Sequence, residues 1–264
     1  MTKAPTTALC RYTDTQIFYR DRDLVGDLMA GGSGDFVALM MAHILGREVS
    51  PREVRVMNAI LITMMEHGLT PSAIATRSVY MSAPENLQGA VAAGLLAVGS
   101  QFVGTIENNA RLLARMVAAP EAARADLAAE IVAEYRAAGR RMPGFGHHLH
   151  RPDDPRALKL LEIGAEEGLE GGHIAALRLL GDAVDAAAGR HITINATGAT
   201  AALMGEMGIP VELMRGFAVI SRAAGLVAHI AEERARPSGR FIWELVDKAI
   251  PFDADGPSGG RDGG

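Results

Sequence analysis

Histidine and arginine residues that could bind an anionic ligand gather in one glycine-rich stretch between Pro143 and Arg156. Its sequence is Pro-Gly-Phe-Gly-His-His-Leu-His-Arg-Pro-Asp-Asp-Pro-Arg. The two glycines before His147 allow tight turns and a close approach of a ligand to the main chain. Asp154 followed by Pro155 is typical of a helix start, where exposed amides favour an anion. The stretch therefore predicts a loop that binds a charged ligand, although a plain connector between helices has the same features.

The histidines of this stretch, His147, His148 and His150, also suggest a transition-metal site, because imidazole is the commonest ligand of such metals. However, no carboxylate or histidine at helical i, i+4 spacing completes a ligand set nearby in the sequence. We therefore expect no metal here.

Two further stretches contain candidate ligand-binding residues. His67 follows an apolar helical pattern and could project from the last turn into a cleft, or could simply interact with the helix dipole. Arg222 lies in the apolar run from Ile220 to His229. A buried arginine needs an anion, since an uncompensated charge in the interior is costly. That anion can be a protein carboxylate or a ligand carboxylate, and the planar guanidinium suits both.

The elements that position these residues are predicted to be helical almost throughout. Apolar residues recur at spacings of three and four, and aromatic residues make up only 5% of the chain. One short extended piece is expected at Ile17-Phe-Tyr-Arg. Helices are expected from Pro51 to about residue 67, from Pro71 onward, and over 86–98, 107–117, 120–138, 155–168, 173–188 and 210–234.

Composition excludes several classes of partner. A net charge of -5 provides no basic field for nucleic acid or anionic lipid. The single cysteine, Cys10, cannot form an internal disulfide or a thiolate metal cluster. Apolar runs are too short to span a bilayer, and residues 1–9 lack a signal-peptide pattern. We therefore expect a cytoplasmic protein, with residues 253–264 as a disordered tail.

Three of these segments, in order along the chain, resemble the citrate synthase superfamily. Pro143-Gly-Phe-Gly-His147 with Asp-Pro-Arg156 resembles its signature loop, and Ser221 to His229 resembles its late active-site helix. Glu66-His67-Gly with Pro71-Ser72 and Arg77 matches an upstream segment, so the resemblance covers roughly residues 12–251. It implies an all-α fold in which a small helical domain (105–208) closes over a large one (1–104 and 209–252).

The resemblance also implies roles for individual residues. His147 would bind the carbonyl or hydroxyl of a carboxylic acid substrate, and His67 would bind the same ligand. Arg156 and Arg222 would bind its carboxylates. Arg236 resembles an arginine that the partner subunit of a homodimer contributes. Several cations in bidentate geometry suit such a multiply charged ligand. A coenzyme A thioester would be the second substrate, contacted by Pro143, Gly144, Phe145, Gly146, Arg140, Arg141 and Arg151.

Two positions depart from the family pattern. Phe102 replaces a family histidine, as in the citryl-CoA lyase module of ATP-citrate lyase, and Thr197 replaces the aspartate that removes the α-proton of acetyl-CoA. The length also resembles that of short citryl-CoA lyases. The resemblance therefore implies a carbon–carbon lyase or acyltransferase for an acyl-CoA and a 2-oxo dicarboxylic acid such as oxaloacetate, without a metal or redox cofactor. Alternatives are a citrate or 2-methylcitrate synthase, a silent CoA-binding subunit, or an enzyme in which Glu107 supplies the base.

Overall fold

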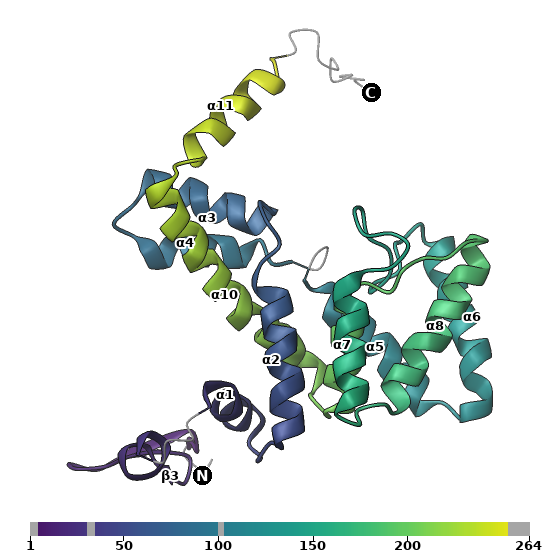
Figure 1. Ribbon diagram of the computed structural model, residues 1–264, viewed down its shortest axis with the longest axis horizontal. Coiled ribbons are helices and arrows are strands. Elements are labelled where there is room, and N and C mark those ends of the chain that lie inside the picture. The colour runs from purple at the N-terminus through teal and green to yellow at the C-terminus, as the bar shows by residue number, and fades with distance from the viewer. Residues whose placement is uncertain (1–4, 31–34, 100–102, 253–264) are drawn as a thin grey trace, which may run out of the picture. The chain divides into compact units, whose positions relative to one another are not determined.

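The computed structural model describes residues 5–30, 35–99 and 103–252, and most of them are helical (Figure 1). Three short antiparallel strands, β1 (Cys10–Tyr12), β2 (Ile17–Tyr19) and β3 (Arg22–Asp23), form a small sheet in that order. The predicted all-α class and the extended piece at Ile17–Tyr19 are confirmed. The predicted tail at 253–264 lies outside the described residues.

The α-helices begin and end close to where the proline, glycine and apolar patterns predict. Short π-helical and 3-10 segments cover Leu24–Met29 and Glu121–Ala123. Three helices were not predicted: α1, α9 and α11. The helices are α1 (Phe36–Leu45), α2 (Pro51–Met65), α3 (Pro71–Ser82), α4 (Leu87–Leu96), α5 (Thr105–Ala118), α6 (Arg124–Ala137), α7 (Pro155–Glu166), α8 (Gly172–Ala188), α9 (Ala196–Glu206), α10 (Val211–Ala235) and α11 (Gly239–Ala249).

Contacts divide the chain into two compact units. The first comprises residues 1–64 and 100–218, and the second comprises residues 65–99 and 219–264. These boundaries differ from those of the predicted domains, 105–208 and the remainder. The predicted division, in which a domain at 105–208 closes over a ligand, stays a prediction.

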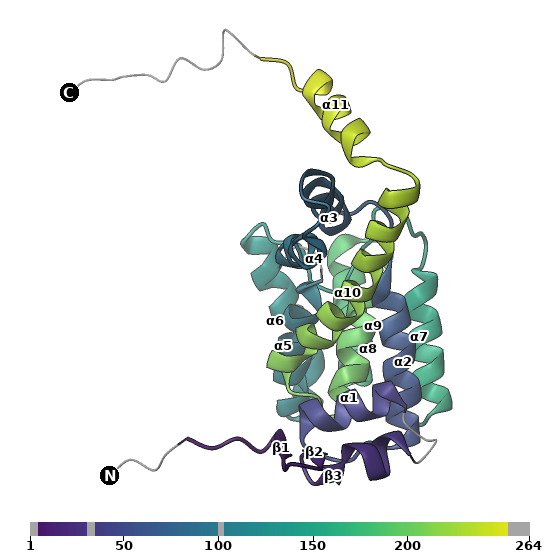
Figure 2. The same cartoon turned by 90° about the vertical axis from the view of Figure 1, so that its left-hand side faces the viewer.

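Helix α9 forms the centre of the first unit (Figure 2). It packs against α5, α7 and α8, and α6 packs against α8. Almost every residue of α9 is buried, because Ala196, Gly198, Ala199 and their neighbours are small on all sides of the helix. A helix buried all round needs no amphipathic pattern. The close packing fixes the start of α9, where Asn195 caps the helix with its side-chain oxygen.

In the second unit, α3 packs against α4 and α11 contacts α3. Close approach in this unit depends on glycine. A Cβ atom on Gly94 would lie 2.0 Å from Thr76 Oγ1, and one on Gly225 would lie 2.0 Å from the main-chain oxygen of Met65. Glycine at 225 therefore lets α10 approach the end of α2 at Met65.

Helix α10 is long and apolar enough to cross a membrane by length and composition, with a mean hydropathy of 1.3 over the relevant window. Half of that window is buried inside the protein. A core helix passes the same test, and the buried side chains of Arg222, His229 and Glu233 on α10 favour that interpretation.

Two glycines of α10 give a matched test of the packing in the second unit. Gly225→Ala should lower the free energy of unfolding by about 1–3 kcal/mol, because the new methyl group meets fixed main chain. Gly216→Ala is the control, since no atom lies within 4 Å of its Cβ position and alanine favours a helix by roughly 0.5–1 kcal/mol. Urea denaturation measures both, and equal stability of the two variants would contradict this description of the packing.

Candidate functional site

The loop at Pro143–Gly146 is held against the segment that leads into α9. Gly146 N donates to Thr193 O at 2.8 Å, and Asn195 N donates to Gly144 O at 3.0 Å. Asn195 Nδ2 also donates to Gly146 O at 2.9 Å. Gly144 and Gly146 have φ angles of +84° and +75°, which only glycine adopts readily. The loop is therefore fixed on the first turn of α9, and its predicted contacts with coenzyme A stay a prediction.

Asp154 fixes the guanidinium of Arg156. Its carboxylate is fully buried and accepts from Arg156 Nε at 3.0 Å and from Nη2 at 2.8 Å. It also accepts from the main-chain N–H groups of Arg156 and Ala196, at 3.0 and 3.1 Å. Burial acts to raise the pKa of Asp154, but the bonds from Arg156 outweigh it and hold the pKa below its usual value. Arg156 is thereby held in one orientation at the start of α7.

His147 lies beside Arg156, and both of its ring nitrogens face N–H groups. Its Nδ1 accepts from the main-chain N–H groups of Leu149 and His150, each at 3.1 Å. A neutral imidazole that accepts at Nδ1 carries its proton on Nε2, and Nε2 lies 3.3 Å from Arg156 Nη2. Burial lowers the pKa of His147 to about 4, and His150 and Arg156 act in the same direction. With its proton on Nε2, His147 would offer a donor to a ligand oxygen beside Arg156 at neutral pH, in place of its contact with Arg156 itself.

The three histidines of this loop stack rather than converge on a metal. The ring centroids of His148 and His150 lie 4.6 and 4.4 Å from that of His147. Within residues 5–30, 35–99 and 103–252, no group of three or more His, Cys, Asp or Glu side chains is arranged to hold a metal ion.

Thr197, in the first turn of α9, takes part in a chain of polar side chains. Its hydroxyl donates to Asn195 Oδ1 at 2.7 Å and accepts from Thr105 Oγ1 at 2.9 Å. The other proposed base, Glu107, forms ion pairs with Arg111 at 2.6 Å and Arg215 at 2.5 Å. Each of its two carboxylate oxygens thus faces an arginine. The remaining altered position, Phe102, lies outside the described residues.

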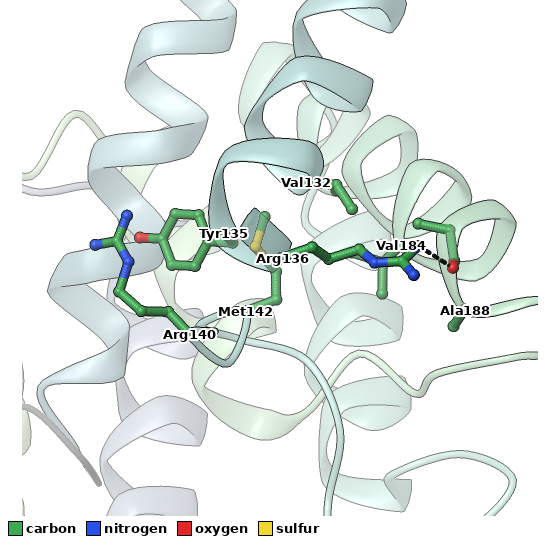
Figure 3. A pocket seen from close by; sticks show the side chains of 8 residues that line it. Val132, Tyr135, Arg136, Arg140, Met142, Val184 and Ala188 are labelled. Carbon is green, nitrogen blue, oxygen red and sulfur yellow. Dashed lines mark hydrogen bonds between the residues drawn. The ribbon is translucent and has the colours of Figure 1, made fainter. Parts of the chain in front are cut away.

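Arg140 borders a pocket of about 310 Å³ between α6 and α8 (Figure 3). Its guanidinium carbon lies 4.3 Å from the centroid of the Tyr135 ring, and Met142 lies beside them. On the opposite side, Arg136 donates to the main-chain oxygen of Ala187. The other two predicted phosphate partners, Arg141 and Arg151, are exposed and do not line this pocket.

Arg222 is buried in the second unit, where most of its hydrogen-bond acceptors are uncharged. Its Nε, Nη1 and Nη2 donate to Ser72 Oγ, Met65 O and Thr70 Oγ1 at 3.0, 3.1 and 2.6 Å. Its ionic partner is Glu66, whose Oε2 lies 3.5 Å from Nη1, longer than a charge-assisted hydrogen bond. Burial lowers the pKa of Arg222. The positive charge is therefore incompletely compensated, which favours a ligand anion.

His67 and Arg236 also belong to the second unit, and both are exposed. Arg236 lines a pocket of about 620 Å³ together with Glu66, Arg77, His229, Glu232 and Ser238. The first unit thus brings together His147, Arg156 and Thr197, while the second contains His67, Arg222 and Arg236.

Sequence reasoning gave no role to Asn195, which holds the loop and caps α9. It also gave none to Glu66 and His229, which are joined by a hydrogen bond. The available signals were an asparagine before a run of small residues and an acidic residue next to His67.

Comparisons with known proteins identify the fold and the family. A citryl-CoA lyase from Hydrogenobacter thermophilus is 30% identical and matches over 97% of this chain and 96% of its own, with a TM-score of 0.82. An ATP citrate lyase from Methanothrix soehngenii, solved with citrate and coenzyme A, has the same fold at 20% identity and a TM-score of 0.76, over 95% of this chain and 42% of its own.

A curated protein of Mycobacterium tuberculosis, named "Putative citrate synthase 2", is 26% identical over 205 residues, which are 74% of this chain. The match covers 53% of that protein, so the chain spans about half the length of the curated relatives it matches. The family model named "Citrate synthase, C-terminal domain" matches residues 3–243. The resemblance seen in the sequence is confirmed, and the chain belongs to the citrate synthase family.

Proposed function

We propose that the protein is a carbon–carbon lyase of the citryl-CoA type, which cleaves a 3-hydroxyacyl-CoA bearing carboxylates or catalyses the reverse addition. The products of cleavage would be acetyl-CoA and a 2-oxo dicarboxylic acid such as oxaloacetate. The observation that carries the proposal is the convergence of His147 Nε2 and Arg156 Nη2, 3.3 Å apart, beside a buried carboxylate that fixes the arginine. Likeness to a citryl-CoA lyase over nearly the whole chain supports it.

In the cleavage direction, a base takes the proton of the 3-hydroxyl group and that oxygen becomes a carbonyl. The bond between C2 and C3 breaks, its electron pair forms the enolate of the acetyl thioester, and a proton is then added at carbon. His147 Nε2–H and Arg156 would donate to the oxygen that carries charge during this step. In the second unit, Arg222, with mainly uncharged acceptors, would bind a substrate carboxylate, and His67 and Arg236 are the further candidates there.

Coenzyme A would bind through the main chain of Pro143–Gly146 and the arginines nearby. The pocket beside Arg140 suits part of such a ligand, because Tyr135 and Met142 offer apolar surface next to the cations of Arg136 and Arg140. The ATP citrate lyase of the same fold was solved with coenzyme A, which supports the assignment.

One observation favours a second candidate, a subunit that binds coenzyme A without turnover. The Thr197 hydroxyl is already engaged with Asn195 and Thr105, and a threonine does not accept a carbon-bound proton at neutral pH. A citrate or 2-methylcitrate synthase is a further alternative, supported by the name of the curated relative. Assays with citryl-CoA, and with acetyl-CoA plus oxaloacetate, separate these three.

We also propose a homodimer in the cytoplasm. Helix α11 exposes the apolar side chains of Phe241, Leu245 and Val246, followed by that of Ile250, and a second subunit could cover them. Arg236 lies three residues before this helix, in a position to accompany it into the neighbouring subunit.

The two site arginines predict a measurable loss of ligand affinity. Arg156→Ala and Arg222→Ala should each weaken citrate binding by about 2–4 kcal/mol, the scale for losing a buried charged partner. Arg178→Ala is the control, because Arg178 forms an exposed ion pair with Glu170. Calorimetry on folded variants checks the prediction. Unchanged citrate affinity in both site variants would contradict the assignment of these two arginines to the substrate carboxylates.

The low pKa of His147 predicts a pH-dependent stability. The folded group titrates near pH 4 and the unfolded group near pH 6.5. Between these values the unfolded chain binds more protons, so the free energy of unfolding falls as the pH falls, by at most about 1.4 kcal/mol per pH unit. His147→Gln should lose this component and show a flatter profile in urea denaturation from pH 7 to pH 4.5. Parallel profiles would show that His147 titrates normally.

Thr197→Asp tests the missing base. If no other carboxylate substitutes, wild-type condensation of acetyl-CoA with oxaloacetate should be slower by roughly the 10²–10⁴-fold that a positioned base contributes. The aspartate is close to threonine in size and should regain part of that rate, with Thr105 Oγ1 available as its donor. A free-CoA assay, matched with hydrogen exchange of the acetyl-CoA methyl group, measures both proteins. Rapid wild-type citrate formation without a gain in the variant would show that Thr197 does not occupy the base position.

The dimer proposal is tested by light scattering, with a dimer or a multiple of dimers expected at micromolar concentration. Phe241→Asp should shift the protein toward the monomer, because a charge in an apolar interface is costly. Leu158→Asp, an exposed apolar position on α7, is the control. A monomeric wild-type protein would contradict the proposal.

A further inference from the structure

Arg77 is, like Arg222, a buried arginine of the second unit. It differs from Arg222 because carboxylates fully balance its positive charge. Arg77 Nη1 donates to Glu233 Oε2 at 2.8 Å, and Nη2 pairs with Glu232. Glu233 is itself buried and also accepts from the main-chain N–H groups of Ser238 and Gly239. Two carboxylates thus neutralise Arg77, which leaves it no excess charge to offer a ligand.

Arg77 determines the tautomer of His229. Its Nε and Nη2 lie 3.1 and 2.9 Å from His229 Nδ1, and the imidazole is 7% exposed. A guanidinium can only donate, so Nδ1 must accept and the ring carries its proton on Nε2. That N–H faces Glu66, whose two carboxylate oxygens lie 3.2 and 3.1 Å away. Arg77 therefore aims a single donor at the Glu66 carboxylate.

Glu66 lies between His229 and two candidate ligand-binding residues, His67 and Arg222. Its Oε1 accepts from the main-chain N–H groups of His67 at 2.8 Å and Gly68 at 2.5 Å, which fixes the chain where it leaves α2. Its Oε2 lies 3.1 Å from His229 Nε2 and 3.5 Å from Arg222 Nη1. Burial acts to raise the pKa of Glu66, but the Gly68 amide, His229 and Arg222 together lower it. The carboxylate is thus ionised and lies closer to His229 than to Arg222.

We propose that His229 and Glu66 are positioning residues for the carboxylate site. His229, oriented by Arg77, holds the Glu66 carboxylate away from full contact with Arg222 and against the main chain of His67. Arg222 thereby keeps positive charge for a substrate carboxylate while His67 keeps a fixed main chain. The inference deepens the proposed function and rests on it, because the ligand is the substrate carboxylate assigned to Arg222.

The arrangement predicts a specific coupling between the two residues. In His229→Leu, Glu66 loses its tether and should close on Arg222, so that it competes with a ligand carboxylate. Citrate affinity should then fall by about tenfold, within the usual coupling of contacting residues. In Glu66→Gln no such competitor exists, and citrate should bind at least as tightly as to wild type. His229→Leu should accordingly have no effect in the Glu66→Gln background.

The experiment is a double-mutant cycle by calorimetry on the full chain, with citrate as the probe and free coenzyme A as the reference ligand. His229→Gln is the conservative control, since its amide can accept from Arg77 and donate to Glu66. It should restore citrate affinity, while coenzyme A affinity stays constant in all variants. An equal loss of citrate affinity from His229→Leu in both backgrounds would overturn the proposal.

Hydrogen exchange in the ligand-free protein separates this inference from the proposed function. His229→Leu should speed exchange of the His67 and Gly68 amides without changing the core helices, and His229→Gln should not. Unchanged exchange in His229→Leu overturns the positioning role. If wild type binds no citrate, the proposed function and the site that this network serves both fail.

If His229→Leu does not fold, comparison of Glu66→Gln with Glu66→Ala tests the positioning role instead. The glutamine keeps an acceptor for the His67 and Gly68 amides and should retain their protection, whereas the alanine should lose it. Citrate binding to Glu66→Gln that is weaker than to wild type would overturn the proposal, because the variant removes only a competing charge.

Discussion

One buried carboxylate, that of Asp154, joins the start of α7 to the start of α9 in the first unit. It caps the start of α7, accepts from Nε and Nη2 along one edge of the Arg156 guanidinium, and accepts from the main-chain N–H of Ala196 at the start of α9. Removing this charge would release the arginine and loosen the first turn that carries Thr197. A full charge in the interior is tolerated because four donors satisfy it. The orientation of Arg156 toward His147 depends on that arrangement.

The second unit shows how the same side chain acquires different roles through its partners. Arg77 and Arg222 are both buried, but Arg77 faces two carboxylates while Arg222 donates mostly to hydroxyl and carbonyl oxygens. Neutral acceptors satisfy the hydrogen-bond geometry of a guanidinium without cancelling its charge. The residual charge is what a carboxylate ligand recognises. Partners, rather than burial, therefore distinguish Arg77 from Arg222, the arginine for which we propose a ligand.

Local chemistry made part of the site predictable from the sequence. The glycines at 144 and 146 and the Asp154-Pro155 pair indicated a tight loop before a helix, and the structure has both. Helix α9 was missed because small residues lie on all its sides, so no 3.6-residue apolar period marks it. The hydrogen bond between Glu66 and His229 could not be predicted from the sequence, for a different reason. These residues are 163 positions apart, and only tertiary packing brings them together.

An enzyme of this family must bind the acid and must also move a proton, and Thr197 affects only the second of these. Binding a multiply charged acid needs cations and donors in fixed positions, which Asp154 provides for Arg156 and His147. Moving a carbon-bound proton needs a basic atom with an unoccupied lone pair facing the substrate. The Thr197 hydroxyl lies in a chain that runs from Thr105 to Asn195, so its proton and one of its two lone pairs are already engaged, and a neutral hydroxyl is a weak base. The residues of the proposed site can therefore bind the acid without moving a carbon-bound proton. That proton would have to be accepted by the substrate itself or by a residue other than Thr105, Asn195 and Thr197.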